Sequence, residues 1–121
     1  MALTFSGVVF DSADPARVAD FWQAALGWSG REPGPRGESV IFPNEGETAL
    51  GPPSIVFQPV PEAKVVKNRV HLDLASDDPE VEVARLEGLG ARRVDVGQPV
   101  DATFVVLVDV EGNEFCVLAP E

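Results

Sequence analysis

His71 is the only histidine in the chain, and it stands two residues before Asp73. The segment from Arg69 to Leu74 alternates polar and apolar residues, which is typical of a strand buried on one face. Side chains at i and i+2 of a strand share a face, so Asp73 is placed to orient the His71 imidazole directly or through water. An imidazole held in this way can transfer protons near neutral pH. His71 and Asp73 are therefore the candidate catalytic pair; the simpler alternative is a histidine that only hydrogen-bonds to its neighbours.

The last strand expected from the sequence, residues 114–119, adds polar groups to the same wall. Phe115 and Val117 are its natural core residues, so alternation turns Glu114, Cys116 and Leu118 to the opposite face. With Val70, Leu72 and Leu74 facing a helix, five polar side chains converge on one concave wall: Arg69, His71, Asp73, Glu114 and Cys116. Such a set is costly to enclose unless its members are paired or hydrated. This wall is the predicted ligand site.

Two further side chains near this wall have alternative interpretations. Cys116 would be a nucleophile if Arg69 or His71 favoured its thiolate, but a cysteine among apolar strand residues is more often a small core residue. Lys67 and Arg69 flank the start of the strand and could hold a ligand carboxylate or phosphate. Pairing with the many nearby acidic residues is the favoured interpretation.

The elements that position these residues come from a repeat in the chain. Residues 7–15, GVVFDSADP, are echoed about 64 residues later by residues 71–79, HLDLASDDP, and each copy runs on into Leu-Gly. Asp14 and Asp78 are predicted N-caps, each followed by a proline suited to the first helical turn. The first helix carries an apolar stripe at Val18, Phe21, Trp22, Ala25 and Leu26 and ends at Gly27; the second is expected over residues 81–89. The repeat predicts two half-domains that share one sheet and a cleft.

Seven strands are expected: residues 3–10, 38–43, 54–58, 69–74, 92–96, 103–109 and 114–119. Residues 31–37, with two prolines and two glycines, are predicted to form a loop, and residues 59–67 a hinge between the halves. The expected fold is α+β, a single domain over residues 1–121 whose modules span about 1–62 and about 67–121. Each module would contain a strand, a helix, and two or three further strands.

Composition excludes some functions. The chain of 121 residues has 20 acidic and 9 basic residues and a net charge of -11, which repels phosphate backbones and argues against nucleic-acid binding. The same charge attracts cationic ligands, although acidity that only maintains solubility is the simpler interpretation. No apolar run approaches the roughly 18 residues of a membrane span, and the first residues lack the features of a signal peptide. With Cys116 as the only cysteine, no internal disulfide can form, so a cytoplasmic location is expected.

Three segments resemble the vicinal oxygen chelate superfamily, which includes glyoxalase I, bleomycin-resistance proteins and extradiol dioxygenases. They are Asp14 to Gly27, Lys67 to Leu74 and Asp109 to Leu118. The combination is most similar to the small glyoxalase-like domain proteins of bacteria. The resemblance implies paired βαβββ modules that curl a mixed sheet around a shared cleft holding a metal or ligand. It also implies a homodimer.

The resemblance further suggests where a metal would bind. His71 occupies the position of the first ligand in the second module, but the matching position of the first module is Gly7. The closing carboxylate ligand falls at Cys116, and the comparable strand of the first half offers Phe57 or Gln58. His71, Cys116 and Gln58 are a poor match for Mg²⁺, Mn²⁺, Ni²⁺ or Fe²⁺, and two secure ligands fall short of the three typical of catalytic zinc. No cofactor is therefore expected, and a divalent metal is the less favoured alternative.

Three functional hypotheses remain. The favoured one is a metal-independent protein of the bleomycin-resistance kind that binds a cationic or aromatic small molecule. Trp28 and Phe57 would contact that ligand together with Arg69, Glu114 and Cys116. The second is a glyoxalase-like lyase or isomerase that uses His71 with Asp73 or a divalent metal. The third is a module that only assembles with itself or a partner.

Overall fold

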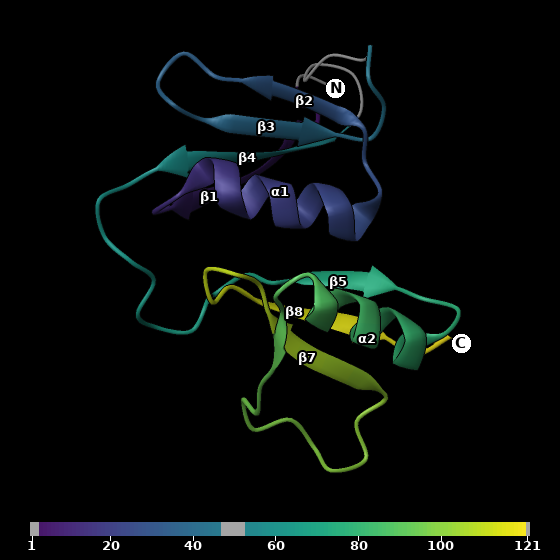
Figure 1. The fold of residues 1–121 in the computed structure, drawn as a ribbon. Coiled ribbons are helices and arrows are strands. Elements are labelled where there is room, and N and C mark those ends of the chain that lie inside the picture. Colours follow the sequence, from purple (N-terminus) through teal and green to yellow (C-terminus); the bar gives the residue numbers. More distant parts are fainter. Residues whose placement is uncertain (1–2, 47–52, 121) are drawn as a thin grey trace. The chain divides into compact units, whose positions relative to one another are not determined.

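The computed structural model describes residues 3–46 and 53–120 of the chain (Figure 1). The chain divides into two compact units, Met1–Ala63 and Lys64–Glu121, close to the two modules expected from the repeat. The structure defines each unit by itself and not their relative placement, so the cleft expected between them stays a prediction. In the described residues, no helix combines the length and apolarity that crossing a membrane requires.

The first unit contains one helix and a four-stranded mixed sheet. In chain order its elements are β1 (Gly7–Ser12), α1 (Pro15–Leu26), β2 (Gly30–Pro33), β3 (Ser39–Phe42) and β4 (Ser54–Pro59). The strand order is β1-β4-β3-β2, with β1 parallel to β4 and the other pairs antiparallel. Helix α1 packs on β3 and β4.

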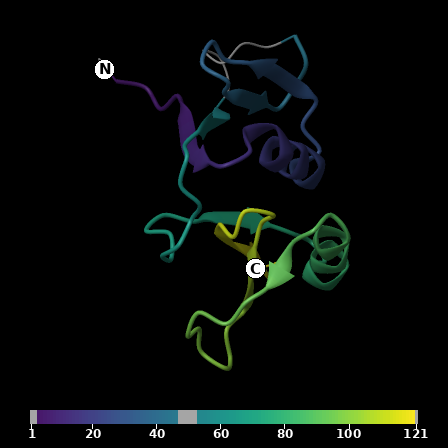
Figure 2. The ribbon, with the colours of Figure 1, turned by 60° about the vertical axis from the view of Figure 1, so that its left-hand side comes forward.

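The second unit repeats this plan. Its elements are β5 (Leu72–Ala75), α2 (Pro79–Gly88), β6 (Arg92–Arg93), β7 (Phe104–Val108) and β8 (Glu114–Leu118). The strand order β5-β8-β7-β6 again joins the first strand to the last in parallel, and α2 packs on β8. The connection between β6 and β7 extends away from α2 in both views (Figures 1 and 2). The predicted α+β fold of two tandem βαβββ modules is confirmed. The single sheet predicted to be shared by both halves is wrong, because in the described residues each unit pairs its strands into its own four-stranded sheet.

The two strand-to-helix turns are nearly superimposable in their geometry. Asp14 has φ -142° and ψ 83°, and Asp78 has φ -139° and ψ 87°. The backbone N–H of each aspartate donates to the hydroxyl of the serine two residues earlier, at 3.1 Å in both turns. Each carboxylate then accepts from the N–H three residues later, which satisfies a donor that the first helical turn leaves free. The predicted N-caps are confirmed.

Each core lies between the helix and its sheet. Val18, Phe21 and Trp22 of the predicted stripe are buried, and Gly27 ends α1 with a φ of 68°. In the second unit, Phe115 and Val117 are buried as predicted, together with these side chains of α2 and β7: Val83, Leu86 and Leu107. These apolar layers fix the register of both sheets.

Several strand boundaries differ from prediction. The first strand begins at Gly7, and Leu3 and Phe5 before it are exposed. Residues 30–33 form β2, so the loop predicted over residues 31–37 is wrong for its first three residues. Pairing with β3 places Pro33 on an edge strand, where its missing N–H is tolerated. Strand β6 contains only two residues.

The strand that follows the hinge also starts later than predicted, at Leu72 instead of Arg69. Val70 does not face a helix, since it is exposed. Residues 69–71, although they alternate between polar and apolar, therefore lie outside β5. This shift bears directly on the predicted ligand wall.

Candidate functional site

A hollow of about 320 Å³ lies within the second unit. Its lining comes from the segment before β5, from β5, β7 and β8, and from the loop after β6: Lys67, His71, Asp73, Val96, Gly97, Gln98, Phe104, Val106, Glu114, Cys116 and Leu118. Ligand pockets commonly have about 300–1,000 Å³ and mix an apolar surface with a few polar groups. This hollow has both properties.

Strand register explains how these side chains meet. Asp73 pairs with Cys116, and Cys116 pairs with Val106, so one row of the sheet presents a carboxylate, a thiol and an apolar group on the same face. The next row presents Leu118 beside Phe104. The pocket therefore has a polar side near β5 and an apolar side toward β7.

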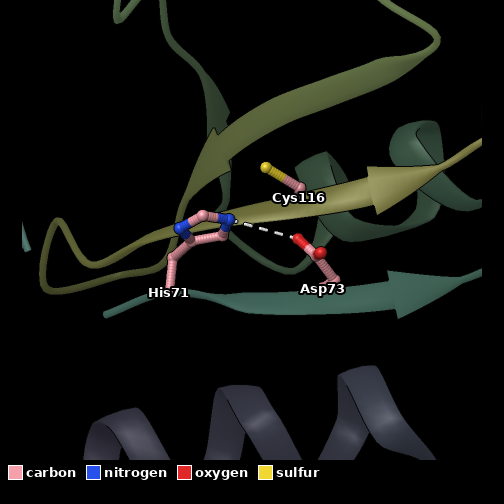
Figure 3. Close-up of side chains that lie close together, drawn as sticks. All are labelled: His71, Asp73 and Cys116. Atoms are coloured by element: carbon pink, nitrogen blue, oxygen red, sulfur yellow. Dashed lines mark ion pairs between the residues drawn. The ribbon is translucent and has the colours of Figure 1, made fainter. Parts of the chain in front are cut away.

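The polar side is centred on His71, Asp73 and Cys116 (Figure 3). His71 Nε2 lies 3.2 Å from Asp73 Oδ1, and one donor atom from each of the three side chains lies within 4.8 Å of the others. The imidazole and the carboxylate are half-exposed, whereas Cys116 is buried. His71 lies just before β5, outside the strand on which it was predicted, but the two side chains meet as predicted.

Cys116 does not have the environment of a nucleophile. Burial raises the pKa of its thiol, and the charge and hydrogen bond of Asp73 raise it further, while Lys67 opposes the shift. A buried thiol beside a carboxylate stays protonated at neutral pH, and thiols react as thiolates. The interpretation of Cys116 as an unreactive strand residue therefore fits the structure.

Glu114 lines the pocket but is already engaged. Its carboxylate accepts from Lys64 Nζ at 2.9 Å and from the backbone N–H of Asn68, also at 2.9 Å. Burial disfavours the charge on Glu114, but the hydrogen bonds from Asn68 and Lys64 outweigh it and lower the pKa of the carboxyl. Asn68 also donates from its side chain to Asn113 at 3.0 Å. Glu114 thus holds the segment before β5 against β8.

Arg69 is not among the residues that line the pocket, which corrects its placement on the predicted wall. The reason is that β5 begins at Leu72, so the strand alternation does not reach back to position 69. Lys67 lines the rim instead. For Lys67 the interpretation favoured from the sequence is pairing with acidic residues, whereas the structure places it in the pocket lining.

The loop side of the pocket was not foreseen from the sequence. Val96, Gly97 and Gln98 line it, and the Gln98 side chain both accepts from the N–H of Val96 and donates to the carbonyl of Val94. The available signal was the uninterrupted apolar sequence of β7, FVVLV, because side-chain alternation then turns the apolar residues Phe104 and Val106 to the face opposite Val105 and Leu107.

The candidate residues of the first unit lie elsewhere. Phe57 is fully buried and packs at a tilt on Phe10, so its ring belongs to the core and offers no surface to a ligand. Gln58 donates to Asp11 at 2.7 Å, and Trp28 is half-buried after the end of α1. None of these three lines the pocket described above. At Gly7 a side chain would overlap the carbonyl of Ser54, so this position cannot supply a ligand atom.

Comparison with known families agrees with this repeated architecture. A model of the glyoxalase-like domain family matches residues 7–118, nearly the full chain. The chain belongs to the glyoxalase-like domain family. This membership, together with the solved structures below, places it in the vicinal oxygen chelate superfamily.

Solved structures share the fold of this family member at low sequence identity. A fosfomycin resistance protein, FosX from Listeria monocytogenes, described as a complex with Mn(II) and 1S,2S-dihydroxypropylphosphonic acid, has a TM-score of 0.73 at 12% identity, with 100% of this chain and 93% of that chain covered. TnmS3, an antibiotic binding protein from Streptomyces sp. CB03234, has a TM-score of 0.62 at 20% identity, covering 100% of this chain and 99% of that one.

A third structure is a glyoxalase/bleomycin resistance protein/dioxygenase family enzyme from Burkholderia phytofirmans PsJN. Its TM-score is 0.69 at 17% identity, with 94% of this chain and 96% of that chain covered. No curated protein sequence matches this chain significantly. These likenesses establish the fold.

Proposed function

We propose that this glyoxalase-like protein binds a small molecule in the pocket of its second unit and does not need a metal to do so. The observation that carries the proposal is a hollow of about 320 Å³ with a polar side and an apolar side built on one sheet face. A neighbouring fold, TnmS3, is described as an antibiotic binding protein, which shows that such a fold supports this class of function. We further propose that the protein is a homodimer and that it works in a reducing compartment. Analytical sedimentation of the purified chain would test whether it is a dimer.

The pocket favours a largely apolar or aromatic ligand that carries a cationic group. Phe104, Val106 and Leu118 offer apolar contact, and the Asp73 carboxylate beside them offers a counter-charge. The net charge of -11 would raise the local concentration of such a cation. The ammonium group of Lys67, which also lines the pocket, can donate a hydrogen bond to a carboxylate or carbonyl group of the ligand.

A manganese-type metal does not fit the residues present. Mn²⁺ prefers oxygen and imidazole ligands, but a thiol occupies the position where the family resemblance implies a carboxylate. The nearest other carboxylate of that strand, Glu114, is engaged by Lys64 and Asn68. Gly7 has no ligand atom to offer. We therefore assign no step of ligand binding to such an ion.

The test is a thermal-shift screen of cationic aromatic compounds and small oxo-acids in the presence of a chelator. We expect at least one cationic aromatic compound to raise the midpoint, and the shift to shrink strongly in Asp73→Asn and His71→Ala. Asp77→Asn removes an exposed acid after the same strand, outside the pocket, and serves as the matched control. Equal shifts in all three variants, or no shift with either class of compound, would contradict the proposal.

Catalysis by His71 and Asp73 is the second candidate function. It is favoured by the 3.2 Å contact between His71 Nε2 and Asp73 Oδ1, which orients the ring and leaves Nδ1 for a substrate proton. An isomerase reaction could use such a group to remove a substrate proton and return it at another atom, and a lyase reaction could use it to remove the proton while the bond to the leaving group breaks. Nuclear magnetic resonance of ligands found in the screen separates the two functions, because an enzyme consumes its ligand and a binding protein returns it unchanged.

A further inference from the structure

Three different kinds of donor atom meet at one point of the pocket wall. They are the imidazole nitrogen of His71, a carboxylate oxygen of Asp73 and the sulfur of Cys116, all within 4.8 Å of one another. Figure 3 shows His71 and Asp73 projecting from the same side of the β5 segment toward Cys116 on β8. Asp73 and Cys116 are register partners in adjacent strands, so their backbones hold two of the donors at a fixed spacing.

The spacing is close to that of a metal site. Zinc bonds of about 2.0–2.3 Å in tetrahedral geometry place donor atoms roughly 3.5 Å apart. The side chains of His71 and Asp73 are 44% and 53% exposed, so both can rotate by the small amount that closes the set around an ion. Cys116 is the fixed member because its strand pairs on both sides.

The donor types decide which ions would bind. A thiolate favours borderline and soft cations such as Zn²⁺, Co²⁺ and Cd²⁺ over Mn²⁺ and Mg²⁺. Glu114 cannot complete an oxygen-rich set, because Lys64 and Asn68 already occupy its carboxylate. Three protein ligands would hold such an ion and leave one coordination position open, as in zinc sites that bind a further ligand.

We propose that His71, Asp73 and Cys116 form a three-ligand site for a divalent cation of the zinc class, built within the second unit alone. Binding exchanges the thiol proton for the cation and releases that proton to solvent. The proposal goes beyond the binding of an organic ligand and does not depend on it. The ligand screen is run with a chelator and the cation experiment without ligand, so that either proposal can fail alone.

The experiment is titration of the reduced, chelator-treated protein with Co²⁺, followed by absorption spectroscopy. A cobalt ion bound by thiolate gives a charge-transfer band in the near ultraviolet that oxygen and nitrogen ligands do not give. We expect this band to saturate at one ion per chain and to disappear when Zn²⁺ is added. Mn²⁺ at the same concentration should not displace the cobalt.

Variants assign the band to individual donors. Cys116→Ser should abolish it. Loss of a group that only supports a metal ligand lowers metal affinity roughly 10- to 100-fold. Because His71 and Asp73 would be ligands themselves, His71→Ala and Asp73→Asn should each weaken cobalt binding by more than that. Asp77→Asn is the matched control and should bind as the unmodified protein does. Cys116→Asp should reverse the preference, so that Mn²⁺ competes with Zn²⁺.

Circular dichroism of each variant shows whether it is folded. If a Cys116 variant does not fold, His71→Ala and Asp73→Asn still test the site, because they replace exposed side chains. Because Cys116 is the only thiol in the chain, absence of the band from the unmodified protein under reducing conditions would overturn the proposal. Cobalt binding that is equal in the unmodified protein, His71→Ala and Asp73→Asn would overturn it as well, since the ion would then lie elsewhere on the acidic surface.

Discussion

Glu114 connects the pocket to the segment that precedes β5. Its two carboxylate oxygens accept from Lys64 and from the backbone of Asn68, and Lys67 lies between these two partners in the sequence. Asn68 is fixed a second time by its bond to Asn113 in the turn before β8. A single carboxylate thereby determines where the rim residue Lys67 stands relative to the pocket.

We expect Glu114→Gln to destabilise the protein by about 1–3 kcal/mol at pH 7, because a charged acceptor of two partly buried hydrogen bonds is lost. The pKa of Glu114 is lowered on folding, so its contribution is present above the ordinary glutamate pKa of about 4.3 and is lost as the pH falls below it. Urea unfolding at a series of pH values measures both effects.

The matched control is Glu62→Gln, which changes an exposed glutamate and should leave the free energy of unfolding nearly unchanged. The difference in free energy of unfolding between the unmodified protein and Glu114→Gln should become smaller as the pH falls through the acid range. A difference that stays constant down to the lowest pH would mean that the charge of Glu114 does not contribute.

At the scale of elements, the two strand-to-helix turns have the same hydrogen-bond pattern. Ser12 and Ser76 each accept from the N–H of the capping aspartate, and Asp14 and Asp78 each cap the helix that follows. The helices themselves differ. Helix α1 has five buried residues and α2 has two, so α2 obtains less stabilisation from packing.

We expect Asp14→Ala and Asp78→Ala each to reduce the free energy of unfolding by about 1 kcal/mol, the usual contribution of an N-cap side chain. Asparagine at either position keeps the acceptor oxygen and should restore most of this loss. Urea unfolding monitored by far-ultraviolet circular dichroism makes the comparison. An asparagine variant as unstable as the alanine variant would show that the carboxylate acts through its charge and not as a cap.

For the whole molecule, the net charge predicts which class of partner is disfavoured. With a charge of -11, the chain is expected to repel a phosphate backbone instead of releasing counterions from it. We expect no binding to duplex DNA, measured by fluorescence anisotropy at low salt, where any electrostatic attraction would be strongest. Saturable binding that weakens with added salt would require a basic surface that the composition does not suggest.

The residue pattern of the chain was sufficient to predict both helices and the repeat of one plan in the two units. Asp14, Asp78 and Gly27 act through local geometry, which depends on neighbours within a few residues and can be recognised in sequence. Strand limits were less predictable. Residues 30–33 become a strand only because β3 pairs with them, and partners that lie from 6 residues (Pro33 with Ser39) to 12 residues (Gly30 with Phe42) away leave no local signal in a segment rich in glycine and proline.

The amino-acid sequence by itself determined the duplicated strand–helix plan, the proximity of His71 and Asp73, and the burial of Phe115 and Val117. These follow from periodicity and capping, which are properties of short segments. Only the tertiary structure decided that Cys116 pairs in register with Asp73, that Lys67 replaces Arg69 at the pocket rim, and that Phe57 and Gln58 are engaged within the first unit. These depend on which strands become neighbours and where their pairing begins, and both are set by packing between distant parts of the chain.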